Sequence, residues 1–265
     1  MRVLAIETAT PIASVALVEA RGVLASRALR APMRHLEWVA AAIEGMLCDV
    51  GSGPESVEGV AVGRGPGGFT GLRIGIATAA AWARARGVPV LGVGTLEILA
   101  CAAGEAGLVL TVLDAHRGEV AAALYRLHTE GAAAGGGAAP QASPDGCAPE
   151  PRCVVPPMVG APDVIVAETR SALRAADAVS TPLLVAGDGL ARHAAALREG
   201  LAAAGIRALI ERPDAYPRAE AAGTLARGRL LRGMRDDPFA VLPIYGRRLA
   251  VRPWQETPTR PGSEG

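Results

Sequence analysis

The residues of this sequence that are best suited to chemistry are a glycine-rich loop and four acidic side chains. The loop lies between an apolar run and a helical pattern, and its candidate residues are Arg64, Gly65, Pro66, Gly67, Phe69, Thr70 and Gly71. The acids that adjoin apolar runs are Glu7, Asp114, Glu119 and Asp188. Backbone N–H groups before a helix can hold a phosphate, and carboxylates at strand ends can hold Mg²⁺. A nucleotide site is therefore the first hypothesis to weigh.

The glycine spacing alone does not establish such a site. Gly63, Gly65 and Gly68 satisfy G-x-G-x-x-G, but the motif lies deep in the chain rather than after a first strand. All 27 basic residues are arginine, so the loop also lacks the lysine of a P-loop. The loop can still hold an anion, with Thr70 as the expected N-cap of the next helix. Close packing and partner docking are the favoured interpretation.

The acidic residues permit two interpretations as well. Aspartate is the usual residue at the end of the first strand, because its short side chain holds a metal ion close to the backbone. Glu7 is longer, and the TAT sequence after it has no glycine to admit a phosphate. Hydrogen-bonded strand ends are the favoured role, and catalytic carboxylates are the alternative.

The cysteines and histidines show no spacing typical of a metal site. They are Cys48, Cys101, Cys147 and Cys153, with His35, His116, His128 and His193. We therefore expect reduced thiols and no metal. Glu7 interrupts the first apolar run too early for a signal peptide, and the apolar stretch at 75–83 is too short to span a bilayer. A soluble cytoplasmic protein is expected, and the formal charge of +1 predicts no strong general attraction to nucleic acid or membrane.

The order of predicted elements repeats along the chain. Hydrophobic patterning predicts strands at 3–6, 13–18 and 23–29, a helix at 35–50, a strand at 57–62, a helix at 72–86 and a strand at 88–93. It then predicts strands at 108–113 and 120–124, a strand at 182–186, a helix at 190–204 and a strand at 207–210. The same plan in both halves indicates a duplicated α/β fold. Residues 129–157 are rich in Gly, Ala and Pro and predict a mobile insertion, 219–235 predicts a helix, and 250–265 predicts a polar tail.

Several motifs together resemble the bacterial TsaB family, also called YeaZ. They are MRVLAIETAT with ASVAL, GRGPGGFTGLRIG, GVGTLE and LDAHRGEV, and they cover the first 125 residues. The remainder matches in outline, through GDG at 187–189 and PIYGR at 243–247. The resemblance implies an actin- and hexokinase-like (ASKHA) fold of two RNase H-like lobes with mixed sheets flanked by helices. Lobes at 1–106 and 107–218 are expected, with the helix at 219–235 returning to the first lobe.

The resemblance also implies a function without catalysis in this chain. The family is a scaffold or activator in the formation of N6-threonylcarbamoyladenosine next to the anticodon of tRNAs that read codons starting with A. Its expected partners are a homologous, metal-bearing TsaD-like subunit and a TsaE-like ATPase, so ATP and metal are expected in those subunits. A homodimer is expected when the partner is missing. The complex can contact tRNA, and Arg247, Arg248 and Arg252 are a possible contact, although a solvated tail is favoured.

The resemblance places the heterodimer interface on the two amphipathic helices of the first lobe. The candidate residues are Met33, Leu36, Val39, Ile43, Ile74, Thr78 and Trp82. About half of these are expected to face the sheet, Val39 and Ile43 first, whereas Trp82 is a plausible anchor. Gly71, Gly75, Ala79 and Ala83 recur every four residues and predict a flat face that permits close backbone approach.

The sequence departs from the family pattern at several positions. Glu7 replaces a common Asp, Gly68 replaces a usual Ser, and His116 and Ala121 interrupt the pattern D-A-R-x-G-E-V-Y. These changes argue against nucleotide in the cleft. The alternative function is an ATP-dependent kinase or ATPase of the same fold, with Asp114 and Asp188 near the metal ion. A glycoprotease has no support, because neither a metal pair nor a Ser-His pairing is evident.

Overall fold

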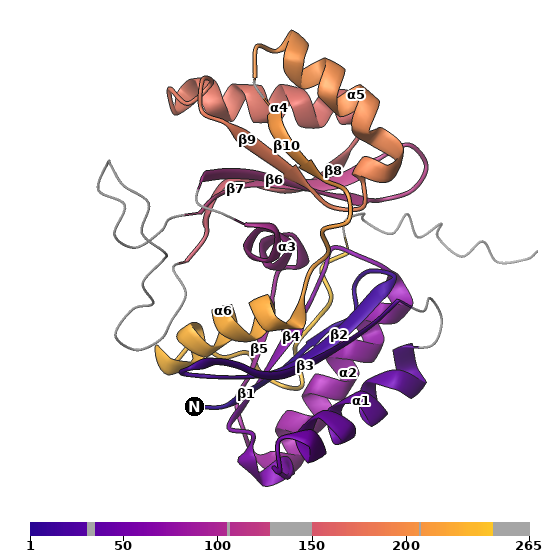
Figure 1. Cartoon of the computed structure of the whole chain (residues 1–265), viewed down its shortest axis with the longest axis vertical. Coiled ribbons are helices and arrows are strands. Elements are labelled where there is room, and N and C mark those ends of the chain that lie inside the picture. Colours follow the sequence, from indigo (N-terminus) through magenta and orange to yellow (C-terminus); the bar gives the residue numbers. More distant parts are fainter. Residues whose placement is uncertain (31–34, 105–106, 128–149, 207, 246–265) are drawn as a thin grey trace, which may run out of the picture.

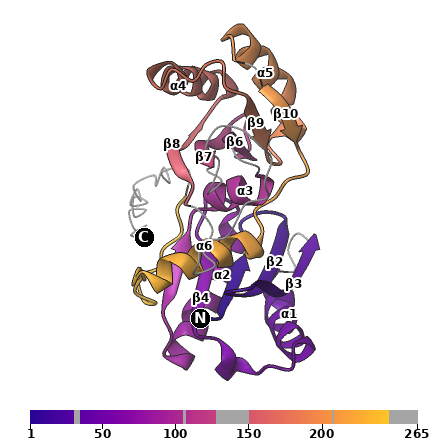
Figure 2. The ribbon, with the colours of Figure 1, turned by 60° about the vertical axis from the view of Figure 1, so that its left-hand side comes forward.

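The computed structural model consists of two α/β lobes, each built on a five-stranded sheet (Figure 1). It describes residues 1–30, 35–104, 107–127, 150–206 and 208–245. A helix, α3 (Thr95–Ala103), lies between the two sheets. The view in Figure 2 separates the lobes from one side and shows α6 (Ala219–Leu231) beneath α3.

The first sheet has the strand order β3-β2-β1-β4-β5. Its strands are β1 (Val3–Glu7), β2 (Ile12–Glu19), β3 (Gly22–Arg30), β4 (Gly59–Gly63) and β5 (Val90–Val93). The strands β1, β2 and β3 are antiparallel, whereas β4 and β5 run parallel to β1. One face of this sheet is covered by α1 (His35–Asp49) and α2 (Phe69–Arg86), and the other by α6. A single 3₁₀ turn, η1 (Pro54–Ser56), precedes β4.

The second sheet repeats this topology, with the order β8-β7-β6-β9-β10. Its strands are β6 (Gly107–Asp114), β7 (Val120–Leu127), β8 (Arg152–Gly160), β9 (Leu183–Ala186) and β10 (Ala208–Arg212). The helices α4 (Pro162–Ala175) and α5 (Leu190–Ala203) cover one face, and α3 covers the other. In both lobes three antiparallel strands precede two parallel ones. This is the RNase H-like topology, and its duplication confirms the predicted ASKHA-type α/β fold.

Burial on both sides explains why the central strands read as continuous apolar runs. In β1, Leu4 and Ile6 pack in the cluster beneath α1 and α2, whereas Val3 and Ala5 pack beneath α6. Successive side chains of a strand point to opposite faces, so helices on both faces require apolar residues at every position. The aliphatic run at 3–6 in β1 therefore indicates a strand at the centre of its sheet.

Several elements differ from those that the hydrophobic pattern predicts. The helices α3 and α4 were not predicted, α2 begins three residues earlier than predicted, and α6 ends at Leu231 and not at 235. The predicted insertion at 129–157 is wrong in its last part, because β8 begins at Arg152 and pairs with β7. Pro156 and Pro157 concealed this strand, since proline is tolerated only where a strand lies at the edge of its sheet. Residues 128–149 lie outside the described part.

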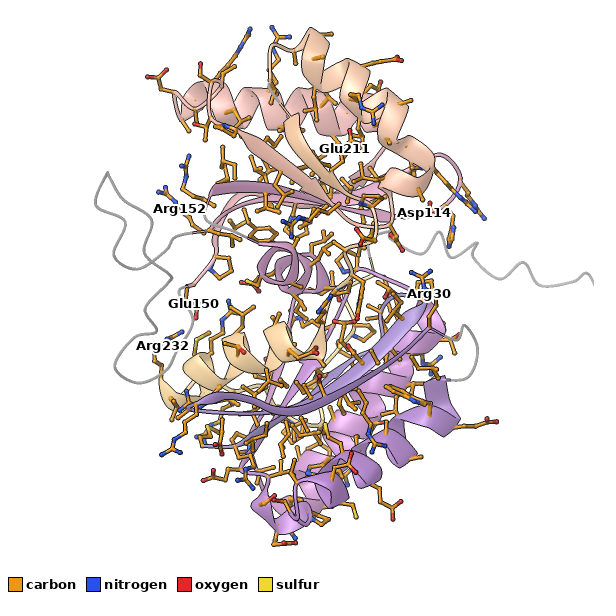
Figure 3. All side chains as sticks on the ribbon, viewed as in Figure 1. Arg30, Asp114, Glu150, Arg152, Glu211 and Arg232 are labelled. Carbon is orange, nitrogen blue, oxygen red and sulfur yellow. The ribbon has the colours of Figure 1, made fainter. Side chains whose placement is uncertain are left out.

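One arginine links the two lobes. Arg229 of α6 places Nη2 2.5 Å from Oε1 of Glu97 in α3 and 2.6 Å from Oε2 of Glu150, which precedes β8. Arg232 also pairs with Glu150, and the two side chains lie together in Figure 3. Arg229 and Glu97 are about 15% exposed, so water screens this pair less than a surface ion pair. The network therefore restrains the angle between the lobes.

The described helices contain no segment that is both long and apolar enough to cross a lipid bilayer.

Candidate functional site

The glycine-rich loop joins β4 to α2 at the side of the first lobe that faces the second. Gly68 is the N-cap of α2, and Leu72 donates its N–H to the carbonyl of Gly68 as the first helical hydrogen bond. The predicted N-cap, Thr70, is wrong, because Thr70 already lies inside the helix. Gly68 has extended backbone angles, and no side chain caps the N-terminus of the helix.

The loop uses its backbone polar groups to hold neighbouring segments. The N–H of Gly65 donates to Oγ1 of Thr95 at 3.0 Å, and the N–H of Thr95 donates to the carbonyl of Gly65 at 2.8 Å. The N–H of Gly68 donates to the carbonyl of Ala9 at 2.7 Å. A phosphate-binding loop leaves such donors free for the ligand. The N–H of Arg64 also donates, to the carbonyl of Val93 at 2.9 Å, so three loop donors are engaged here, which favours a packing role.

Glu7 lies beneath this loop and not in the open cleft. Its side chain is fully buried, Oε1 accepts the N–H of Ala9 at 2.7 Å, and Oε2 accepts the hydroxyl of Thr95 at 3.4 Å. Burial raises the pKa of Glu7 to about 7, against which the hydrogen bonds from Ala9 and Thr95 act. The favoured role of a hydrogen-bonded strand end therefore agrees with these contacts, whereas the predicted place of Glu7 among the acids of the cleft is wrong. Through its hydrogen bond with Thr95, the Glu7 side chain links the end of β1 to the first residue of α3.

A cavity of about 560 Å³ lies between the lobes, and it contains Asp114 and Asp188. The N–H of Asp114 donates to Oδ1 of Asp188 at 3.1 Å, and Arg192 places Nη1 3.1 Å from Oδ2 of Asp114. His116 donates its backbone N–H to Asp114 at 2.8 Å. Burial raises the pKa of Asp188. The carboxylate of Asp114 is therefore engaged within the second lobe, by the guanidinium of Arg192 and the backbone N–H of His116.

Of the four predicted acids, Asp114 and Asp188 are thus brought together at the cleft, whereas Glu7 and Glu119 do not line it. Glu119 lies at the end of the turn between β6 and β7, and its backbone N–H and carbonyl bond to His116 and Ala115. Among the described residues no group of three or more His, Cys, Asp or Glu side chains is arranged to hold a metal ion. Cys147 and His128 lie outside the described part. The contact of Arg192 with Asp114 was not predicted, because no sequence pattern distinguishes this arginine from the other exposed residues of α5.

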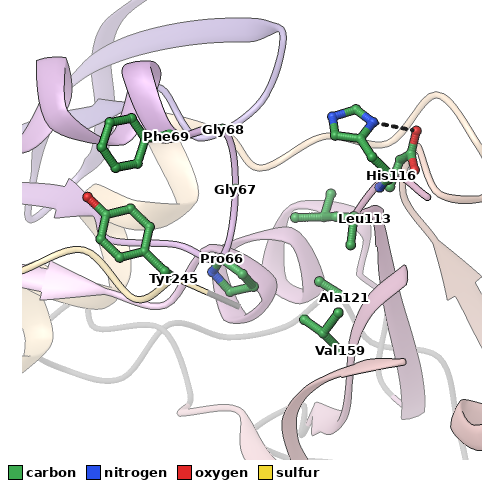
Figure 4. Close-up of a pocket in the computed structure, with 11 residues that line it drawn as sticks. Pro66, Gly67, Gly68, Phe69, Leu113, His116, Ala121, Val159 and Tyr245 are labelled. Carbon is green, nitrogen blue, oxygen red and sulfur yellow. Dashed lines mark hydrogen bonds and ion pairs between the residues drawn. The ribbon is translucent and has the colours of Figure 1, made fainter. Parts of the chain in front are cut away.

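A smaller cavity of about 320 Å³ adjoins the loop and is lined mainly by apolar side chains (Figure 4). The rings of Phe69 and Tyr245 lie stacked on one side, with centroids 5.2 Å apart. Leu113, Ala121 and Val159 form the opposite side in the second lobe. The last residues of the described chain thus return to the glycine-rich loop.

The predicted interface residues have different environments. Val39 and Ile43 are 1% and 2% exposed and pack on the sheet, so their assignment to a partner surface is wrong. These are the two residues that were expected first to face the sheet. Ile74, Thr78 and Trp82 are half-buried along one side of α2. The indole N–H of Trp82 is buried without a partner in the described part. Met33 and the side chain of Leu36 lie outside the described part.

The small-residue face of α2 packs against the protein itself. Gly71, Gly75, Ala79 and Ala83 are all buried. A side chain at Gly75 would collide with the hydroxyl of Thr8, which donates to the carbonyl of Gly71 at 2.8 Å. The close backbone approach that these residues predict therefore occurs between α2 and the end of β1, and not with a partner.

Comparisons with known proteins agree with this architecture. Residues 12–140 match the family model described as "TsaD: tRNA N6-adenosine threonylcarbamoyltransferase". The chain is 39% identical over 134 residues to the TsaB protein of Escherichia coli K12, named a tRNA threonylcarbamoyladenosine biosynthesis protein, which covers 49% of this chain and 58% of that protein. It is 32% identical over 127 residues to the equally named protein of Bacillus subtilis 168, covering 48% and 56%. The match thus spans little more than half the length of these curated relatives.

The structural similarity extends further along the chain. A solved Pseudomonas aeruginosa protein, titled as having similarity to peptidase YEAZ, superposes with a TM-score of 0.72 at 28% identity. It covers 93% of this chain and 99% of that one. A structure titled YeaZ from the same organism gives a TM-score of 0.69 at 27% identity and covers 92% and 100%.

The fold and the site define the chain as a two-lobed protein of the ASKHA class with a packed glycine-rich loop. The comparisons confirm, within this class, the resemblance to the TsaB (YeaZ-like) family.

Proposed function

We propose that this chain acts in the biosynthesis of threonylcarbamoyladenosine in tRNA, as a non-catalytic scaffold or activator subunit. The observation that carries the proposal is the similarity of its first half to proteins named for that pathway. Its expected partner is a homologous, metal-bearing TsaD-like subunit that performs the transfer, with a TsaE-like ATPase on the pair. A homodimer is expected in the absence of that partner.

The geometry of the cleft supports a role without catalysis. The loop donors of Gly65 and Gly68 are used within the protein, Glu7 is buried, and Asp114 is paired with Arg192. A phosphoryl-transfer site needs free donors and carboxylates that can reach a metal ion. The described part of the chain therefore offers little stabilisation for charge that develops in a transition state.

The alternative, an ATP-dependent kinase or ATPase, predicts a different result in a binding titration. We expect isothermal titration of the isolated chain with ATP and Mg²⁺ to give no binding in the micromolar range. We expect this result because the loop N–H groups bond within the protein and Asp114 forms an ion pair with Arg192. Micromolar affinity together with magnesium-dependent turnover would establish the alternative instead.

Association with the TsaD-like subunit tests the proposal directly. The wild-type chain is expected to form a one-to-one complex, and Trp82→Arg is expected to weaken it by at least about tenfold, because an aromatic anchor is replaced by a charge. Trp82 is half-buried, so a second variant, Ala81→Arg, places the same charge at an exposed neighbouring position without entering the core. Affinity is measured by titration of purified subunits.

Ala202→Arg provides the matched control, since Ala202 is exposed on α5 in the other lobe. It is expected to change the affinity less than twofold. Failure of the wild-type chain to bind the TsaD-like subunit would refute the scaffold function. Binding that all three variants leave intact would refute only the location of the interface.

A further inference from the structure

The last described segment of the chain, residues 236–245, is attached to the edge of the first sheet and is termed here the C-terminal strap. Asp236 starts it, with its N–H 2.8 Å from the carbonyl of Val90 in β5. Oδ2 of Asp236 accepts the N–H of Gly92 at 2.7 Å. The strap is therefore bonded to β5 through both its backbone and a side chain.

The strap then follows α2 in the opposite direction. Near its start, the ring of Phe239 lies 4.3 Å from Cζ of Arg84 in the last turn of α2. At its end, Tyr245 stacks on Phe69, the first residue of α2 (Figure 4). A helix rises 1.5 Å per residue, so six extended residues have about the length of the helix between these two contacts.

Two further contacts fix the path of the strap. Val241 is buried and belongs to the same apolar cluster as Ala79 and Ala83 of α2. The N–H of Ile244 donates to the carbonyl of Arg64 at 2.6 Å. The strap is therefore part of the folded lobe, with one side chain in its core.

The outer side of the strap and the turn before it is unusually apolar. Four of the ten exposed large apolar side chains of the described chain lie on the strap, and they are Phe239, Leu242, Ile244 and Tyr245. A fifth, Met234, lies in the turn before it, and Leu231 lies at the end of α6. Phe239 is 74% exposed and Leu242 is 71% exposed. Scattered apolar residues are normal on a surface, whereas a gathered group marks an interaction site.

The strap adjoins the face on which the partner interface is proposed. Ala77 and Ala81 are exposed on α2, one turn apart. At 100° per residue, Trp82 and the other half-buried candidates lie on one flank of this alanine face. Phe69 and Arg84, which contact Tyr245 and Phe239 of the strap, lie on the other flank. Small residues between two bulkier flanks let another helix approach closely.

We propose that the C-terminal strap forms the second wall of the partner-binding surface, so that a helix of the TsaD-like subunit lies on the alanine face between Trp82 and the strap. This inference rests on the proposed function. It assigns Phe239 and Leu242 as apolar anchors for that helix. The partner helix carries an apolar ridge.

The charges around the strap specify the flank of that helix. Three exposed arginines, Arg84, Arg86 and Arg235, lie near the start of the strap, together with one exposed acid, Asp237, whose Oδ1 accepts the N–H of Phe239. The arginines outnumber the acid, so the net charge of this region is positive. The flank of the partner helix that faces the strap is therefore acidic. Apolar anchors at the centre and arginines at the rim are typical of a surface that binds another protein. A nucleic acid would present phosphates to this surface and would leave Phe239 and Leu242 uncovered.

The double variant Phe239→Ser/Leu242→Ser tests this inference. We expect its affinity for the purified TsaD-like subunit to fall by about tenfold or more, because two central anchors are lost. Both side chains are mostly exposed, so its thermal unfolding is expected to match that of the wild type. The control is Val164→Ser on α4, which removes a 44% exposed apolar side chain from the second lobe and is expected to leave the affinity within twofold.

The outcomes separate this inference from the function on which it rests. If Trp82→Arg weakens the complex and the double variant binds like the wild type, the strap is not part of the interface and only this inference is overturned. If the wild-type chain does not bind the subunit at all, both proposals are overturned. If the double variant loses affinity only for an anticodon stem-loop RNA, the strap is a nucleic-acid contact and the inference is again wrong.

Discussion

At pH 8 the Glu7→Gln variant is expected to be more stable than the wild-type chain, by up to about 3 kcal/mol, whereas at pH 4.5 the two are expected to be similar. The physical reason is the burial of a carboxyl group beneath the glycine-rich loop. Burial raises the pKa of Glu7 from 4.5 to about 7. The folded protein therefore prefers the neutral side chain, which glutamine imitates at every pH.

The sign of the effect follows from proton binding. Between pH 4.5 and pH 7 the folded state holds a proton on Glu7 that the unfolded state has largely lost. The stabilising contribution of the neutral group is fully present below pH 4.5 and is lost as the pH rises through 7. Urea unfolding at intervals from pH 4.5 to pH 8 measures the difference in free energy between variant and wild type. That difference should grow with pH and level off above 7.

Glu44→Gln is the matched control for this series. Glu44 is exposed on α1, so its replacement should leave the free energy of unfolding unchanged within about 0.5 kcal/mol across the same range. A Glu7→Gln variant that is less stable than the wild type at pH 8 would show that the charged carboxylate is the stabilising form. In that case the hydrogen bonds from Ala9 and Thr95 would outweigh the cost of burial.

The hydrophobic pattern was sufficient to predict the duplicated fold but not the elements between the repeats. The continuous apolar run at 3–6 is typical of a central strand, and the amphipathic pattern of α1 is typical of a helix that covers a sheet. The helix α3 has no polar face because both lobes cover it, so its sequence lacks the helical periodicity that identified α1. The edge strand β8 was hidden by its two prolines.

The candidate site was predictable in its residues but not in its contacts. The sequence indicated correctly that the glycine-rich loop packs closely, yet it could not reveal that Glu7 lies under the loop or that Thr95 bonds to both. Those contacts join residues that are 30 and 88 positions apart, and no local pattern encodes them. The C-terminal strap escaped notice for the same reason, since it depends on the return of the chain to α2 after α6.

Replacement of Gly67 by serine is expected to destabilise the protein by about 2–3 kcal/mol, a typical cost of overpacking. A Cβ atom at this position would lie 2.6 Å from the Cβ of Ala9 and closer still to its carbonyl oxygen, which is shorter than the sum of the van der Waals radii in each case. The backbone of Gly67 does not have a positive φ, so the cost is steric and does not come from strain in the conformation. The obstructing atoms include backbone, which cannot move aside as the end of a flexible side chain can.

The neighbouring variant Gly68→Ser provides the control, because it introduces the same side chain one residue later. A Cβ atom at Gly68 would lie 3.5 Å from the carbonyl oxygen of Ala9, an ordinary contact, and serine is a favourable N-cap for α2. Its stability is expected to equal or slightly exceed that of the wild type in urea unfolding. Equal stability of both variants would mean that the loop has room to move away from Ala9. The loop would then be free to open toward the cleft, and its backbone donors would be available to a ligand.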